Sequence, residues 1–464
     1  MMTTEMDRTA TAISFEADEQ TWKDIDLFDQ GKVGTAFTFF NRVKTRGGEV
    51  ALERMLKSPS NHRIVLEGRR DTIRFFRDER IDLQIGREQL RKIEHYLSSG
   101  VFLFPHLWSK AFLYSIRYQL KHTSAHLALN NGIRMTVSLL RYLFELRESW
   151  LAGDCPDVLA HELAGLPGLV ADQRVRELVM GGSRRLRLID LARCDRYFRG
   201  AGKPCLQHLL RLLYEWDVFE AIATVTQHYD WCFPQYDDSP EPFVRAEGLF
   251  PPWLTGTVSN DFNLGKGPNL CFITGANRAG KTTFLKSFGL AVYLAHVGFP
   301  VPARSFRATV FNGLLITIDL CDGMGQGYSH FYSEVRRLKD ILGQIREKKR
   351  VLVIFDDLFL GTHVKETGGE VLQVIEGLAG IGGNLFLLST PVVEIADGLQ
   401  GNRNIAFSCF ESETEGGVPW YSYRLREGVS RERTGTALLR EEGVLDMLEQ
   451  LQMKQAAARS EGRL

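Results

Sequence analysis

The stretch from Ile273 to Thr283, ITGANRAGKTT, constrains the fold of this chain more than any other, because it fits the pattern G-x-x-x-x-G-K-S/T. The apolar run NLCFI before it is typical of a buried strand, and TTFLKSFGLAVYLAHV after it is typical of a helix. In such a strand–loop–helix unit, glycines let backbone N–H groups turn towards phosphate oxygens, and the helix dipole adds to the attraction. We therefore predict a nucleotide-binding loop and not a simple flexible turn. The predicted binding residues are Gly275, Ala276, Asn277, Arg278, Ala279, Gly280, Lys281, Thr282 and Thr283.

A second apolar run, RVLVIFDDLFLGT, lies downstream of the loop and contains two consecutive aspartates. By itself, such a run is as often a simple strand cap as a functional site. Near a phosphate loop, however, one carboxylate can hold Mg2+ through water, and the next can orient an attacking water. We predict that Lys281 contacts the β- and γ-phosphates of ATP. Thr282 and Asp356 are predicted to hold Mg2+, and Asp357 to orient the water as the catalytic carboxylate.

Composition describes an ordinary soluble protein that is too long for a single core. The chain has 464 residues, of which 44% are apolar and 25% charged, and its formal net charge is zero; two or three domains are expected. The charge is uneven, because residues 31–150 carry 21 lysines and arginines against 11 acidic residues. Such a segment can bind the phosphate backbone of a nucleic acid. A helical surface whose charges are only solvated explains the excess equally well. Arg69, Arg70, Arg74 and Arg77 lie on one or two faces of a predicted helix and could follow a DNA backbone, but a lever helix that carries solvated charge is the favoured explanation.

The pattern of the sequence changes near residue 240. Residues 21–235 have apolar positions three and four apart, which predicts helices. The stretch PEPFVRAEGLFPPWLTG is rich in proline and glycine and is predicted to be a boundary. Beyond it, apolar runs alternate with helical segments, which predicts a mostly parallel α/β sheet. The predicted divisions are a disordered tail (1–20), a helical domain (21–240), a nucleotide domain (241–430) and a helical tail (431–464).

Cysteine usage and hydropathy indicate a reduced, cytoplasmic compartment. The seven cysteines include no C-x-x-C pair, and Cys271 lies within a predicted buried strand, so free thiols are expected. No stretch has the pattern of a signal peptide. The most apolar long run, GLAVYLAHVGFPVPA, contains Pro-x-Pro and falls short of the roughly 20 residues that span a bilayer. We therefore expect no membrane partner.

Several motifs resemble those of the MutS family. VSNDFNL and ITGANRAGKTTFLKS resemble the family's V-x-N-D-x-x-L strand and its G-x-N-x-x-G-K-S/T loop, with Asn277 at the asparagine position. GYSHFYSEV resembles the segment G-R-S-T-F-x-x-E, DDLFLGTHVKE resembles D-E-x-x-R-G-T-x-x-x-D, and LLSTPVVEIADGL resembles the last core strand. The likeness is strong over 255–395 and weaker before about residue 230.

The resemblance implies an α/β plus all-α fold, in which an ABC-type P-loop NTPase domain follows a helical lever and core domain. It implies a Mg2+-dependent ATPase that works as a homodimer, in which Ser329 of one subunit acts catalytically on ATP held by the other. The function it implies is an ATP-driven conformational switch on DNA, bound without sequence preference and distorted or branched, in repair or recombination. The alternative is a nucleotide switch that grips a protein or ribosomal partner without binding DNA.

Departures from the family pattern qualify these expectations. Asp357 stands where the family has glutamate, one methylene longer, and Pro391 stands where the family has histidine. Both changes predict slow hydrolysis, because the attacking water and the γ-phosphate would be held less well. The sequence contains no Phe-x-Glu, and no α/β domain is expected before the helical segment. The resemblance therefore predicts no dedicated reader of mispaired bases.

Overall fold

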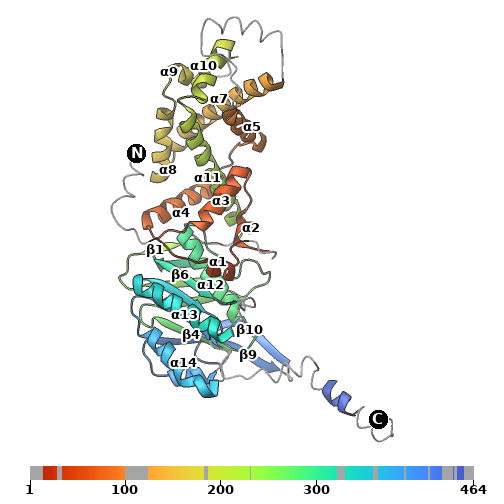
Figure 1. Cartoon of the computed structure of the whole chain (residues 1–464), viewed down its shortest axis with the longest axis vertical. Coiled ribbons are helices and arrows are strands. Elements are labelled where there is room, and N and C mark those ends of the chain that lie inside the picture. Colours follow the sequence, from red (N-terminus) through yellow and green to blue (C-terminus); the bar gives the residue numbers. More distant parts are fainter. Residues whose placement is uncertain are drawn as a thin grey trace. The chain divides into compact units, whose positions relative to one another are not determined.

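The computed structural model describes the chain over 14–28, 34–99, 124–181, 186–229, 231–320, 330–358, 364–390, 393–415, 418–430, 443 and 447–453. The chain folds into two compact units (Figure 1). Unit 1 comprises Met1–Thr38, Pro59–Leu66 and Asp230–Leu464, and unit 2 comprises Phe39–Ser58 and Glu67–Tyr229.

The main sheet of unit 1 has six strands in the order β10-β9-β4-β8-β7-β6. Their bounds are β4 (Leu270–Gly275), β6 (Gly313–Thr317), β7 (Val351–Phe355), β8 (Leu385–Thr390), β9 (Ile405–Glu415) and β10 (Val418–Glu427). All neighbours are parallel except β9 and β10, which are antiparallel. Every residue of β4, β6, β7 and β8 is buried, which explains why these strands are continuous apolar runs and do not alternate. The predicted α/β character is confirmed.

Helices cover both faces of this sheet. On one face lie α13 (His330–Glu347) and α14 (Val364–Ala379) (Figure 1). Together with α15 (Val393–Leu399) they pack on strand residues such as Phe272 and Val353. On the other face lies α12 (Lys281–Val297). There, a Cβ on Gly289 of α12 would lie 2.4 Å from Ile316 and 3.5 Å from Ile354, so the helix runs close against β6 and β7.

A second, four-stranded sheet covers the other side of α12. Its order is β1-β5-β2-β3, with β1 (Gln235–Asp237), β2 (Phe243–Leu249), β3 (Asn260–Gly265) and β5 (Ser305–Thr309). The ring of Phe262 lies 5.1 Å from those of both Phe284 and Phe288, and the Tyr236 hydroxyl donates to the Ala295 carbonyl at 2.6 Å. Because α12 is sandwiched between two sheets, nearly all its residues are buried and not only the one face that its sequence pattern suggests. The stretch predicted as the boundary contains β2, which pairs on both sides in spite of the flanking prolines. The two units divide earlier, between Tyr229 and Asp230.

The N-terminal arm, residues 14–28, is part of unit 1. Glu16 forms a parallel bridge with Gly313 at the free edge of β6, and α1 (Glu19–Asp24) follows. The Asp24 carboxylate accepts hydrogen bonds from the backbone of Ile318 at 2.8 Å and of Asp319 at 3.2 Å. The predicted disordered tail is therefore wrong for residues 14–20, because an edge strand offers unpaired backbone groups that a polar sequence can satisfy. Residues 1–13 lie outside the described ranges.

We predict that Asp24 protects the chain just after β6 from local opening. Asp24→Ala should leave the amides of Ile318 and Asp319 unpaired and speed their hydrogen exchange by about tenfold or more. Burial raises the pKa of Asp24, so a neutral acceptor is tolerated, and Asp24→Asn should restore most of the protection. Exposed Glu19→Ala is the control on the same helix. Equal exchange in Asp24→Ala and the unchanged protein would contradict this role.

The regular elements in the described part of unit 2 are all helices. It contains α3 (Arg46–Lys57), most of α4 (Arg63–Asp78), α5 (Arg87–Ser98), α7 (Ser124–Leu151), α8 (Asp157–Gly165), a short 3-10 helix (Leu166–Leu169), α9 (Gln173–Met180), α10 (Leu188–Phe198) and α11 (Lys203–His228); α2 (Ala36–Phe40) lies where the units meet in sequence. The predicted helical domain over 21–240 is thus shared, because residues up to 38, 59–66 and those from 230 onwards belong to unit 1. Apolar periodicity identified these helices, whereas their assignment to units depends on tertiary contacts.

Three arginines of α4 are paired with acids on the same helix. Arg70 contacts Asp71 at 2.8 Å, Arg74 contacts the same carboxylate at 3.5 Å, and Arg77 contacts Asp78 at 2.7 Å. Such pairs reduce the field that the helix presents to a distant phosphate backbone. The positive charge of this helix is therefore weak support for nucleic-acid binding.

Candidate nucleotide site

The loop between β4 and α12 has the backbone shape that a phosphate-binding loop needs. Gly275 has a φ of +150° and Gly280 a φ of +104°, both favoured by glycine. A Cβ on Gly275 would lie 3.0 Å from the carbonyl oxygen of Phe410, so β9 also leaves little space for a side chain there. Arg278 adopts a φ of +71° without being glycine, which is a strained conformation found often at functional sites.

Lys281 is buried at the mouth of this loop. Its side chain belongs to the first residue of α12, and the residue is only 5% exposed. The ammonium donates to the carbonyl oxygens of Gly275 at 3.0 Å and Ala276 at 3.3 Å. Burial lowers the pKa of Lys281, while Asp357 and Asp356 oppose that shift. A buried cation held against the loop is well placed to meet an anionic ligand.

Asp356 and Thr282, the predicted Mg2+ residues, come together across the site. Asp356 follows β7 directly, and its carboxylate accepts a hydrogen bond from the Thr282 hydroxyl at 2.5 Å. The Ser389 hydroxyl, at the end of β8, donates to the other carboxylate oxygen. Ser389 was not among the predicted site residues, although it lies in the segment LLSTP, near the end of the strand between β4 and β7. A hydroxyl and a carboxylate are oxygen ligands of the kind that Mg2+ prefers.

Asp357 occupies a different environment from Asp356. Its backbone is left-handed, with a φ of +50°, and its amide donates to the Ser389 hydroxyl at 3.3 Å. One carboxylate oxygen is buried and makes no hydrogen bond to a residue that the structure describes. Burial, and then the charge of Asp356, raise the pKa of Asp357 to about 6, although Lys281 opposes the shift. A carboxylate that titrates near neutrality can accept a proton from water.

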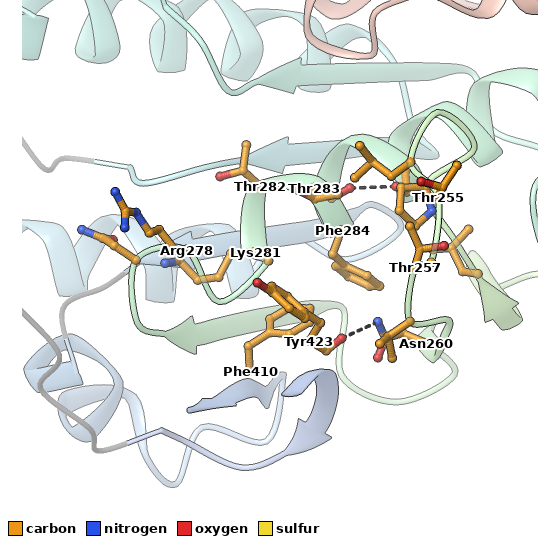
Figure 2. Close-up of a pocket in the computed structure, with 18 of the residues that line it drawn as sticks. Thr255, Thr257, Asn260, Arg278, Lys281, Thr282, Thr283, Phe284, Phe410 and Tyr423 are labelled. Carbon is orange, nitrogen blue, oxygen red and sulfur yellow. Dashed lines mark hydrogen bonds between the residues drawn. The ribbon is translucent and has the colours of Figure 1, made fainter. Parts of the chain in front are cut away.

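A cavity of about 510 Å³ opens beside the loop (Figure 2). Its walls come from the loop, from α12, from Asp357, from the segment after β2 and from two aromatic residues on β9 and β10. The lining residues include Leu254, Thr255, Thr257, Asn260, Lys281, Thr282, Phe284, Phe410 and Tyr423. A smaller cavity of about 220 Å³ is lined by Thr317, Glu334, Asp356 and Asp357, among others. Asp357 lines both cavities.

Sequence reasoning did not identify the aromatic wall, because Phe410 and Tyr423 follow the loop by well over a hundred residues in sequence. Only the pairing of β9 with β4, in which Phe410 lies opposite Gly275, brings this wall to the loop. The predicted catalytic Ser329 lies outside the described residues, as do Gly327 and Pro391. From the same predicted segment, Glu334 is described, and it is buried on α13.

The parallel sheet, the glycine loop and the buried lysine define this region as a P-loop nucleotide-binding domain. Residues 271–452 match the family model described as MutS domain V. Over this region the chain is similar to the MutS family, as its motifs suggested. In MutS homologues, domain V is an ATPase domain.

Three relatives illustrate the extent of the similarity. Proteins with the name "DNA mismatch repair protein MutS" from Anaplasma phagocytophilum and from a Geobacillus species are 30% and 27% identical to this chain, over 223 and 237 residues. These matches cover 48% and 50% of this chain, and 27% of each relative. The protein of the same name from Bacillus thuringiensis is 27% identical over 50% of this chain and 26% of its own length. The matched part therefore spans about a quarter of these curated relatives.

Two further predictions concern membrane-spanning segments and the cysteines. No helix in the described part of the chain is both long enough and apolar enough to cross a membrane. The described cysteines, including buried Cys271, are free thiols.

Proposed function

We propose that this chain binds ATP with Mg2+, hydrolyses it slowly, and uses the nucleotide as a conformational switch on DNA. The observation that carries the proposal is the convergence of Lys281, Thr282, Asp356 and Asp357 at the mouth of one glycine loop. MutS-family ATPases use ATP and Mg2+, and the oxygen ligands and buried cation of this site fit that pair.

The proposed roles follow from the local chemistry. Backbone N–H groups of the loop and the Lys281 ammonium bind the phosphates, and Thr282 and Asp356 are the residues that would hold Mg2+. When bound, Mg2+ neutralises charge that develops on the phosphate oxygens. Asp357 orients water and accepts its proton, which its raised pKa favours. Because its carboxylate is one methylene shorter than that of glutamate, we expect the water to be held loosely and turnover to be slow.

The cavity also suits the base of the nucleotide. Tyr423 and Phe410 bring aromatic rings to the wall beside the loop, and Phe284 and Leu254 add apolar surface (Figure 2). Aromatic faces stack on the flat faces of nucleobases. We therefore propose that the base binds between the loop and the segment after β2, on the side of Tyr423.

A homodimer is the proposed working unit. In the predicted tail, the described helical residues Met447, Leu448, Leu451 and Met453 are all at least half exposed, which supports contact with another chain. Each site would then be completed by Ser329 of the partner subunit.

DNA is the proposed partner because the relatives of this chain are DNA mismatch repair proteins by name and because residues 31–150 carry an excess of basic residues. The arginines of α4 that pair with acids on the same helix add little to the electrostatic attraction for DNA. We propose contacts mainly to phosphates, and a preference for distorted or branched DNA in repair or recombination.

We predict that DNA binding depends steeply on salt and weakly on sequence. Affinity for duplex and branched DNA should fall about a thousandfold between roughly 50 and 200 mM salt, because phosphate contacts release counterions. A single mispair should improve affinity by less than about tenfold, because only the shape of the DNA would be read. Fluorescence anisotropy, with and without ATP, measures both effects.

The control in this experiment is a matched duplex of the same length. Strong discrimination between mispaired and matched duplex would contradict the proposed mode of binding. No binding at low salt would instead support the alternative, a nucleotide switch that grips a protein or ribosomal partner.

A further inference from the structure

The strand β10 is irregular at Tyr423. Its pairing with β9 shifts register between Tyr421 and Leu425, and Tyr423 itself has a φ of +55°. Tyrosine rarely adopts this left-handed conformation, so other parts of the structure must hold it there. A bulge of this kind changes the direction in which a side chain points.

Asn260, the first residue of β3, holds this irregular segment from outside the β9–β10 pair. Its side-chain amide donates to the carbonyl oxygen of Tyr423 at 3.0 Å, and its side-chain oxygen accepts from the amide of Leu425 at 2.7 Å (Figure 2 shows the first bond). Both polar atoms of Asn260 are therefore used on backbone groups at the register shift. They satisfy groups that the shifted ladder would otherwise leave unpaired.

The held conformation brings the Tyr423 ring to the phosphate loop. A Cβ on Gly280 would lie 3.3 Å from Cδ1 of Tyr423, so the ring lies next to the backbone of the loop. Tyr423 and Asn260 line the same cavity as Lys281. Tyr423 is nevertheless 47% exposed, so packing alone does not hold it in place.

We propose that Asn260 is a positioning residue that sets affinity for the nucleoside part of the ligand by holding Tyr423 at the cavity wall. This inference rests on the proposed function of the site. Without Asn260, the backbone at Tyr423 and Leu425 loses the two hydrogen bonds that come from β3. If Tyr423 then returns from its left-handed conformation to an extended one, its ring points in another direction and leaves the loop. The phosphate part of the site depends on the loop and Lys281, and does not use these bonds.

The test compares two ligands on the full chain. Binding of a non-hydrolysable ATP analogue and of inorganic tripolyphosphate, each with Mg2+, is measured by calorimetry. Asn260→Ala should weaken binding of the ATP analogue by about tenfold, which is the order of one lost base–aromatic stack, and should leave tripolyphosphate binding unchanged. Asn263→Ala is the matched control, because Asn263 is an exposed residue on the same strand that does not line the cavity.

Coupling to Tyr423 distinguishes positioning from a direct contact. Tyr423→Ala should weaken binding of the ATP analogue as much as Asn260→Ala, and the double variant should lose no more than either alone. Should Asn260→Ala fail to fold, Asn260→Asp supplies a second variant: it keeps the acceptor for Leu425 but lacks the donor for Tyr423, so it should lose part of the affinity.

The outcomes separate this inference from the proposed function. If the unchanged protein binds both ligands and Asn260→Ala binds the ATP analogue equally well, the positioning role is wrong while nucleotide binding stands. Equal losses for both ligands, or additive losses in the double variant, would also overturn it. If the unchanged protein binds neither ligand, the proposed function fails, and the inference fails with it.

Discussion

Replacing Lys281 with alanine is expected to weaken ATP binding by about a hundredfold or more, and with it to remove measurable ATPase activity. Charge-assisted hydrogen bonds to phosphate are among the strongest that a side chain makes. Here the ammonium is already buried against the loop carbonyls of Gly275 and Ala276. Its removal would also leave the carboxylates of Asp356 and Asp357 facing the phosphates without a nearby counter-charge.

Equilibrium binding of a fluorescent ATP analogue measures this effect. Lys349→Ala is a matched control, because Lys349 is an exposed lysine at the opposite end of β7 from Asp356. Thermal unfolding of both variants shows whether the fold persists. Binding of ATP by Lys281→Ala with unchanged affinity would move the phosphate site away from this loop.

Asp357→Asn is expected to keep ATP binding and to reduce turnover by about a hundredfold or more, because the amide cannot accept a proton from water. The substitution removes a negative charge close to the phosphates, so affinity for ATP should stay the same or increase. Single-turnover hydrolysis and ATP binding are measured on the same preparation. Full turnover in Asp357→Asn would assign the base to another carboxylate, and Glu366 would be the next candidate.

The pH dependence gives an independent check on Asp357. Because the pKa of its carboxyl is raised to about 6, kcat/KM of the unchanged protein should fall as the pH is lowered through about 6. The folded state binds this proton more tightly than the unfolded state, so the ionised carboxyl costs stability, and stability falls as pH rises from about 4 through 6. Asp357→Asn should therefore raise the melting temperature at pH 8 but not at pH 4. If the melting temperatures of Asp357→Asn and the unchanged protein differ by the same amount at pH 8 and at pH 4, Asp357 is not the titrating group.

The local chemistry of the site was predictable from the sequence. A glycine loop between an apolar strand and a helix is a continuous pattern of some twenty residues, so Lys281 and Thr282 could be placed without tertiary information. The pair Asp356–Asp357 could be linked to the loop because the carboxyl ends of parallel strands meet at one edge of a sheet. The structure brings Asp356 to Thr282 as that argument requires.

Other parts of the site could not be predicted, because long-range pairing decides them. Ser389 reaches Asp356 only because β8 lies between β4 and β7. Tyr423 reaches the loop only through a register shift in β10 and the side chain of Asn260 on β3. No local pattern in the sequence marks either contact.

The sequence by itself thus determined the glycine loop, its carboxylates and the similarity to the MutS family, because each depends on residues that are neighbours along the chain or share a motif. The tertiary structure alone decided that residues 14–28 close the edge of β6, that α12 is buried between two sheets, and that aromatic rings from β9 and β10 form a wall of the cavity. The physical reason is that an edge strand, a helix face or a bulge is satisfied by whichever group the fold brings near. That partner is set by the packing of the whole unit and not by neighbouring residues.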